Sequence, residues 1–164
     1  MKYNDTIGPY VKSENDTKSM MIRLLISLTP IICFAIFKSF ILGFYYTNVS
    51  IMNLLNPLFL IIASIISSLL AEGFYFKIIK KNSFKLLIKN ISTSYSIIPG
   101  ILLALLLPIN TPIWIVILGS FIASIIGKMI YGGLGTNIFN PALIGYLIII
   151  SMYSSKLGTF FSAY

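Results

Sequence analysis

Acidic residues are scarce in this sequence of 164 residues, which has four Asp and Glu against twelve Lys and Arg. Charged residues make up only 10% of the chain, whereas a soluble domain has about 25%, so the composition excludes an ordinary water-exposed globule. It also excludes a disordered chain, because disorder requires low hydrophobicity and 57% of these residues are apolar. The composition therefore predicts a polytopic membrane protein.

Histidine is absent and cysteine occurs once, at Cys33. Without histidine the sequence cannot form a zinc–histidine site, a Ser-His triad or a His-ligated haem. A lone cysteine can neither close an internal disulfide nor hold an iron–sulfur cluster. We therefore expect no metal site and no catalytic residues in this chain.

Basic residues gather beside the apolar runs, and five of the eleven lysines lie between Lys77 and Lys89. A nucleic-acid surface would need basic residues and stacking aromatics along one face, so we expect no nucleic-acid partner. An excess of lysine beside membrane spans marks their cytoplasmic side. We therefore predict a multi-pass protein of the inner or plasma membrane with a cytoplasmic N-terminus.

The apolar runs predict an all-α membrane protein with about five transmembrane helices. We expect a cytoplasmic arm over 1–19, a five-helix membrane domain over 20–153, and an outer-side tail over 154–164 where the chain looks cut. The expected spans cover about 20–46, 56–76, 94–108, 113–131 and 138–153, with a basic cytoplasmic loop at 77–90. The third run is shorter than the roughly 20 residues that cross a bilayer.

Glu72 is the only acidic residue inside an apolar run. A carboxylate at membrane depth costs about 2.5–3.5 kcal/mol at the helix centre, and such acids are functional candidates by default. Two interpretations stay open. Glu72 is either an acid at a helix end paired with Lys77, Lys80 or Lys81, or a carboxylate of an ion pathway that faces the interior of the bundle.

Glycine and proline interrupt two of the expected helical segments. Broken helices at membrane depth are tolerated where they line a cavity or are buried in protein, and their ends offer free N–H and C=O groups to ions. The simpler alternative is a tight loop between helices. The candidate residues of these breaks are Pro99, Gly100, Gly132, Gly133, Gly135, Asn137, Asn140 and Pro141.

The stretch 99–150 carries a series of motifs that resembles one membrane family. It contains Leu107-Pro108 followed by Thr111-Pro112, then Gly127-Lys128, and the run G-G-x-G-x-N-x-x-N-P-A-L from Gly132 to Leu143. The chain resembles the N-terminal half of the RnfD proteins of Rnf-type electron transport complexes and of the related NqrB proteins of the sodium-translocating NADH:quinone reductase.

This resemblance implies one half of a ten-helix inverted repeat in a redox-driven ion pump, with other subunits, membrane lipids and Na⁺ or H⁺ as partners. It implies that Glu72 stands where the family places an acid for cation uptake. Family members bind FMN covalently through a threonine in an S-G-A-T motif, and riboflavin is a further candidate cofactor. That motif does not occur in this sequence, so we assign no FMN attachment residue and expect a fragment or a split gene product.

The residues also leave room for two functions of other classes. Broken helices suit a passive channel or a solute transporter built from a five-helix half-repeat. A structural assembly protein without a site of its own is the other alternative.

Overall fold

The computed structural model describes residues 17–45, 54–81 and 83–157, and every regular element in these ranges is a helix. The prediction of an all-helical chain is therefore confirmed. The elements are α1 (Thr17–Tyr45), α3 (Asn56–Phe74), η1 (Tyr75–Ile79), α4 (Phe84–Ser94), α5 (Ile97–Leu106), α6 (Ile113–Ser124), η2 (Ile125–Met129), α7 (Pro141–Tyr153) and η3 (Ser154–Lys156). Helices thus occupy each segment in which we expected a span, whereas the N-terminal arm and most of the outer tail lie outside the described residues.

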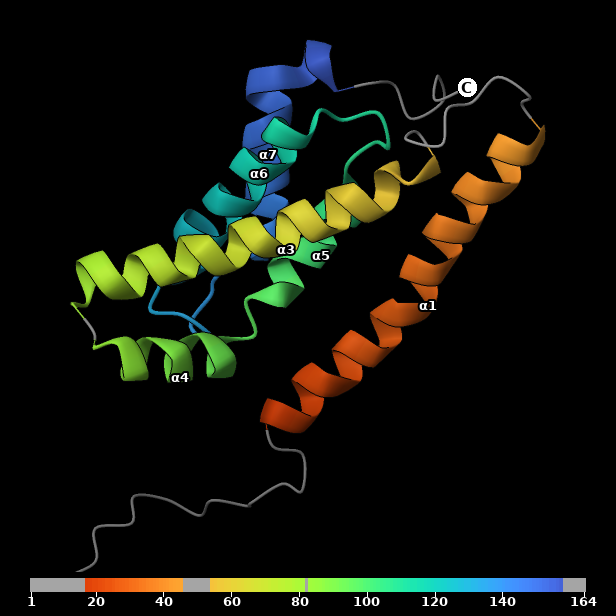
Figure 1. Cartoon of the computed structure of the whole chain (residues 1–164). Helices are drawn as coiled ribbons and strands as arrows, with labels where there is room; N and C mark the ends of the chain where they lie inside the picture. The colour runs from red at the N-terminus through yellow and green to blue at the C-terminus, as the bar shows by residue number, and fades with distance from the viewer. Residues whose placement is uncertain (1–16, 46–53, 82, 158–164) are drawn as a thin grey trace, which may run out of the picture.

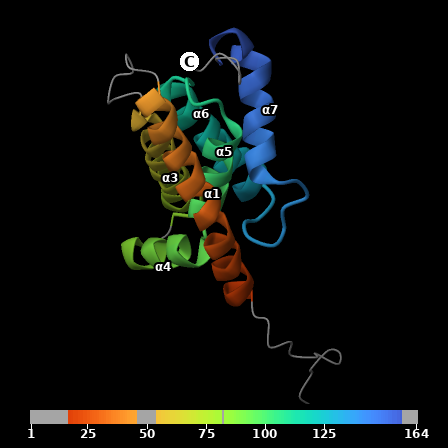
Figure 2. The same ribbon diagram turned by 90° about the vertical axis from the view of Figure 1, so that its right-hand side faces the viewer.

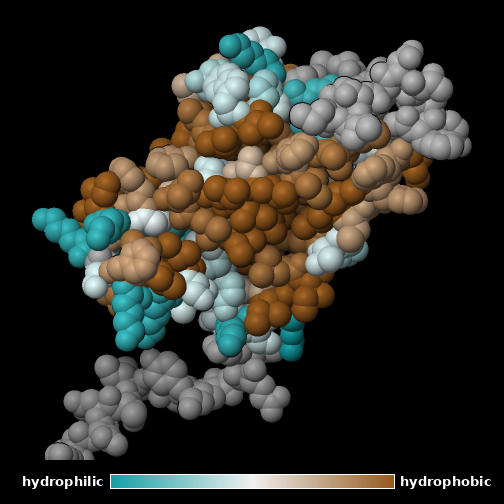
Figure 3. All heavy atoms as spheres, viewed as in Figure 1, coloured by the Kyte–Doolittle hydropathy of each residue, from teal (hydrophilic) through white to brown (hydrophobic). Residues whose placement is uncertain are grey.

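Helices α3, α5, α6 and α7 form a bundle, and α1 lies along one side of it (Figures 1 and 2). One apolar cluster joins α3, α5, α6 and α7 through Leu60, Leu103, Ile115 and Ile149. A second cluster, of Leu28, Ile61, Ile101 and Ala104, holds α1 against α3 and α5. On the face that Figure 3 shows, apolar side chains form a continuous band across the bundle. Such a band suits a chain whose outer side chains face lipid.

In the described ranges, two helical stretches are long and apolar enough to cross a membrane: Thr17–Ile41 within α1, and Asn56–Ile79, formed by α3 with η1. Helices α4 and α5 together pass the same test but are bent by 49° where they meet, so they count as a third span only if taken as one. Helix α6 with η2, Ile113–Met129, is apolar but shorter. The number of five crossings therefore stays a prediction.

The segment 77–90 differs from the expected basic loop, because it contains the end of η1 and the first half of α4. Helix α4 forms because Phe84, Leu87, Ile88 and Ile91 recur with the i, i+3, i+4, i+7 spacing of one helix face. The lysines of this segment favoured the prediction of a solvated loop over that of a helix.

The break expected at Pro99-Gly100 also differs, because α5 continues through both residues. Pro99 lies in the first turn of α5, where a backbone N–H has no intrahelical partner and proline is tolerated. The chain instead bends at Tyr95, which has the left-handed φ of 51°. Gly100 serves close packing, since a Cβ there would lie 2.9 Å from the carbonyl oxygen of Ser64 on α3.

The two ends of the bundle differ in character. The first turn of α1, helix α4 and the end of α3 lie at one end, and the last turn of α7 lies at the other (Figures 1 and 2). At that other end Trp114 stacks edge-on against Tyr153, and the Lys156 amine lies 5.5 Å from the Trp114 ring. The basic segment and the beginning of α1 thus share one end, as the expected topology requires.

Candidate functional site

A ladder of buried polar side chains joins α3 to α6 and to η2, which continues α6. Ser64 Oγ lies 2.5 Å from Ser120 Oγ, and Ser68 Oγ lies 2.8 Å from Ser124 Oγ. The third rung is Glu72, whose Oε1 accepts a hydrogen bond of 2.5 Å from the Nζ of Lys128. Successive rungs are four residues apart on both helices, which is close to one helical turn, so the rungs lie on one face of each helix. The residue numbers rise in the same direction on both sides of the ladder, so the two helices run parallel.

The Glu72–Lys128 rung is an ion pair without access to solvent, because the side chains are 0% and 1% exposed. The Lys128 amine makes a second hydrogen bond, of 2.5 Å, to the backbone oxygen of Ser94 in the last turn of α4. The other oxygen of Glu72, Oε2, is buried and has no hydrogen-bond partner among the residues that the structure describes. The pair therefore neutralises its own charge but keeps one acceptor oxygen open.

Pairing of Glu72 with Lys77, Lys80 or Lys81 is wrong, since its partner is Lys128 on η2. The three nearby lysines are exposed. The Lys80 amine lies 5.8 Å from the ring of Phe76. Sequence reasoning missed Lys128 because 56 residues separate it from Glu72. One signal was available: the same spacing of 56 also relates the two serine pairs.

The expected break between the fourth and fifth helices is present, from the end of η2 to Pro141. Gly132, Gly133 and Gly135 have φ values of +108°, +104° and +88°, which side-chain-bearing residues rarely adopt. The break is also compact, since a Cβ on Gly127 would lie 2.6 Å from Cα of Pro141. Glycine is therefore required both for the turn and for the close approach of η2 to α7.

The two asparagines of this break have different environments. Asn140 is the N-cap of α7, and its Oδ1 accepts a hydrogen bond of 3.0 Å from the backbone N–H of Ala142. Oδ1 of Asn137 is buried and accepts no hydrogen bond from the described part of the chain. Of the candidate residues, Asn140 thus has a structural role in the folded chain, whereas Asn137 keeps a free acceptor.

Replacing Asn140 with alanine should lower the free energy of unfolding by about 1 kcal/mol, because the first turn of α7 loses its capping acceptor. Asn140→Ser should retain most of the stability, since a serine hydroxyl can cap in the same way. Unfolding in mixed detergent micelles measures both variants. Equal losses in the alanine and serine variants would contradict a capping role.

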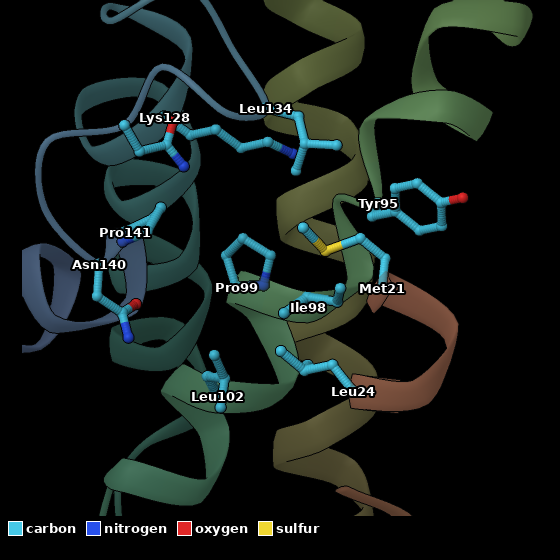
Figure 4. A pocket seen from close by; sticks show the side chains of 11 residues that line it. Met21, Leu24, Tyr95, Ile98, Pro99, Leu102, Lys128, Leu134, Asn140 and Pro141 are labelled. Atoms are coloured by element: carbon cyan, nitrogen blue, oxygen red, sulfur yellow. The ribbon is translucent and has the colours of Figure 1, made fainter. Parts of the chain in front are cut away.

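A small cavity of about 150 Å³ lies beside Lys128, between the first turns of α1 and α5 and the break before α7 (Figure 4). Four of the candidate residues line this cavity, whereas Glu72 and the glycines do not. Glu72 is hydrogen-bonded to Lys128, which does line it. The lining residues are Met21, Leu24, Tyr95, Ile98, Pro99, Leu102, Lys128, Leu134, Asn137, Asn140 and Pro141. Among the described residues, no group of three or more Cys, Asp or Glu could hold a metal ion.

This cavity does not fit a flavin. Cavities that hold ligands of drug size have about 300–1,000 Å³, and this one is smaller and mostly lined by apolar side chains. The sequence also lacks the S-G-A-T attachment motif. This cavity is therefore too small for a flavin, and its lining residues are not assigned to one.

Comparison with known proteins gives one consistent family. Curated relatives named as the D component of an ion-translocating oxidoreductase complex include those of Buchnera aphidicola, 37% identical over 151 residues, and Escherichia coli, 32% identical over 157 residues. These alignments cover 92% and 96% of this chain but only 38% and 40% of the relatives, so the chain spans about two fifths of their length. The model of the NQR2, RnfD, RnfE family matches residues 5–164, and the chain therefore belongs to this family.

Proposed function

We propose that this chain is the membrane-embedded N-terminal part of the RnfD component of an ion-translocating oxidoreductase complex in the plasma membrane. The family and the names of the relatives support this assignment. The lysines of 77–89 lie at the end of the bundle where α1 begins, and this end is cytoplasmic by the positive-inside rule. The partners are the other subunits of the complex.

Glu72 is the proposed acid of the ion path. The observation that carries this proposal is its fully buried carboxylate, at the end of a polar ladder. Its Oε1 is bound to Lys128, and its Oε2 has no partner within the described ranges. A proton or a sodium ion that arrives at Oε2 shares the carboxylate with the Lys128 amine. Since Lys128 also has the carbonyl of Ser94 as an acceptor, the amine has a second partner when the cation competes for Glu72.

The flavins belong to the whole protein and lie outside the described residues in this proposal. The helices described here form the scaffold against which the flavin-bearing part packs. Bound FMN or riboflavin would supply one-electron chemistry. This chain contributes position and the Glu72–Lys128 pair.

Glu72→Gln tests the ion path in the assembled complex, reconstituted in vesicles with an electron donor. Redox-driven uptake of Na⁺ or H⁺ should fall about tenfold. Even mutation of a residue that only orients a metal ligand costs at least about this factor in metal affinity or activity. Electron transfer should continue. Uptake without an electron donor would instead indicate a passive channel.

A matched double variant separates an ion path from a purely structural ion pair. Glu72→Met with Lys128→Met removes both charges and keeps the volume, so the complex should assemble. The ion path requires that this variant also fails to translocate, whereas normal translocation would show that the pair only supports the fold. Ser68→Ala with Ser124→Ala, which removes the neighbouring uncharged rung, is the control and should translocate normally.

A further inference from the structure

Helix α4 has an apolar face that the bundle covers only in part. Leu87 and Ile91 are partly buried, and Ile91 approaches Gly73 on α3. Phe84 and Ile88 continue the same face but are 70% and 54% exposed. The inner half of this face therefore packs on protein, and the outer half has no protein against it among the described residues.

The adjoining face of α4 is basic. Lys85 and Lys89, four residues apart, share one side of the helix and are exposed. Lys77, Lys80 and Lys81 lie just before α4 and are exposed as well. Glu72 is the only acid in the part of the chain that the structure describes, and it is bound to Lys128. The counter-charge for these five lysines must therefore come from outside the described residues.

The position of α4 matches the edge of a bilayer. It lies beneath the end of α3 in both ribbon views (Figures 1 and 2), and hydrophilic residues gather there at the rim of the apolar band (Figure 3). Helix α4 is bent by 49° relative to α5, so it does not continue in the direction of that helix. Its 11 residues span about 16 Å, too little to cross the hydrocarbon core.

We propose that α4 is an interfacial helix that binds anionic phospholipid headgroups of the bilayer. Phe84 and Ile88 enter the boundary between headgroups and acyl chains, and the lysines of 77–89 contact the phosphates. A helix with one apolar and one lysine-rich face is the type that lies in this plane. An acidic protein partner would satisfy the lysines but would not by itself require the neighbouring exposed apolar side chains, so the combination favours lipid.

The lipid-binding helix α4 also contacts the polar ladder. The Lys128 amine binds the backbone oxygen of Ser94 in the last turn of α4. The position of this interfacial helix is therefore tied to the Glu72–Lys128 pair, although lipid binding by α4 does not depend on Glu72 carrying an ion.

A lipid-quenching experiment tests the proposal in the assembled complex. Ile88→Cys, in a Cys33→Ser background, carries a fluorophore, and the vesicles contain phosphatidylglycerol and phosphatidylcholine with a doxyl quencher on one or the other. We expect quenching by both lipids, with a preference for phosphatidylglycerol. Lys85→Gln with Lys89→Gln should lower this preference at least about fivefold, since each lysine near an anionic surface contributes roughly that factor.

The control removes the same charge elsewhere. Lys38→Gln with Lys156→Gln replaces two exposed lysines outside the 77–89 segment and should leave the preference unchanged. An equal fall in the control, or no fall in the α4 variant, would overturn specific lipid binding. A fluorophore at position 88 that neither lipid quenches would show that another protein of the complex covers α4, and would overturn the proposal as well.

Discussion

Lys128→Met should lower the free energy of unfolding by about 3–5 kcal/mol, the cost of breaking a buried ion pair from one side. The change leaves the Glu72 carboxylate buried without its cation, since the side chain is 0% exposed. It also removes the hydrogen bond to the carbonyl of Ser94. Unfolding in mixed detergent micelles, followed by circular dichroism, measures the loss.

The double variant Glu72→Met with Lys128→Met should recover most of this stability, because replacing both charges by apolar groups of similar volume is often neutral or stabilising. The serine rung again provides the control: Ser68→Ala with Ser124→Ala removes one interhelical hydrogen bond, which is worth about 0.6 kcal/mol in membrane proteins. If the double Met variant is as unstable as Lys128→Met, the two residues are not coupled as the ion pair requires.

The second large effect is expected at the contact between α6 and α7. A Cβ on Gly145 would lie 2.7 Å from the carbonyl oxygen of Gly119 and 2.8 Å from Cβ of Ala123. Gly145→Ala should therefore push the two helices apart and cost about 1–3 kcal/mol, as overpacking does in other cores. The same micelle unfolding experiment measures it.

Gly73→Ala is the matched control for this prediction. It is the same substitution within a helix, but the one described atom within 4 Å of its Cβ would be Cδ1 of Ile91, at an ordinary distance of 3.6 Å. Because alanine favours the helix over glycine, Gly73→Ala should stabilise by about 0.5–1 kcal/mol. Effects of the same sign and size at both positions would show that close packing does not decide the outcome at Gly145.

Local patterns were sufficient to place most helices. Asn56-Pro57 and Asn140-Pro141 open α3 and α7, where proline is favoured in the first turn. Pro108 follows the end of α5. Glycines with positive φ mark the break before α7. Each of these features depends on a few neighbouring residues, which a sequence displays directly.

Two of the three errors came from features that depend on packing, whereas the third, at α4, came from a local pattern that was present in the sequence. Pro99 and Gly100 suggested a broken helix, but the helix begins just before them and uses Gly100 to approach α3. Helix α4 was expected as a loop, since its lysines outweighed its apolar spacing. The partner of Glu72 could not be chosen from local sequence, because the nearby lysines are exposed and do not pair with it. Lys128 lies next to Glu72 only because α3 packs parallel to α6 and η2.

Serines alone would not set the axial alignment of α3 and α6. A slide of four residues, about 6 Å along the helix, would bring Ser68 opposite Ser120 and still satisfy both hydroxyls. The same slide would place Glu72 opposite Ser124 and Lys128 opposite Phe76, leaving two buried charges apart. Of these two alignments, only the observed one pairs the two charges, so the ion pair favours a single native alignment of α3 with α6 and η2.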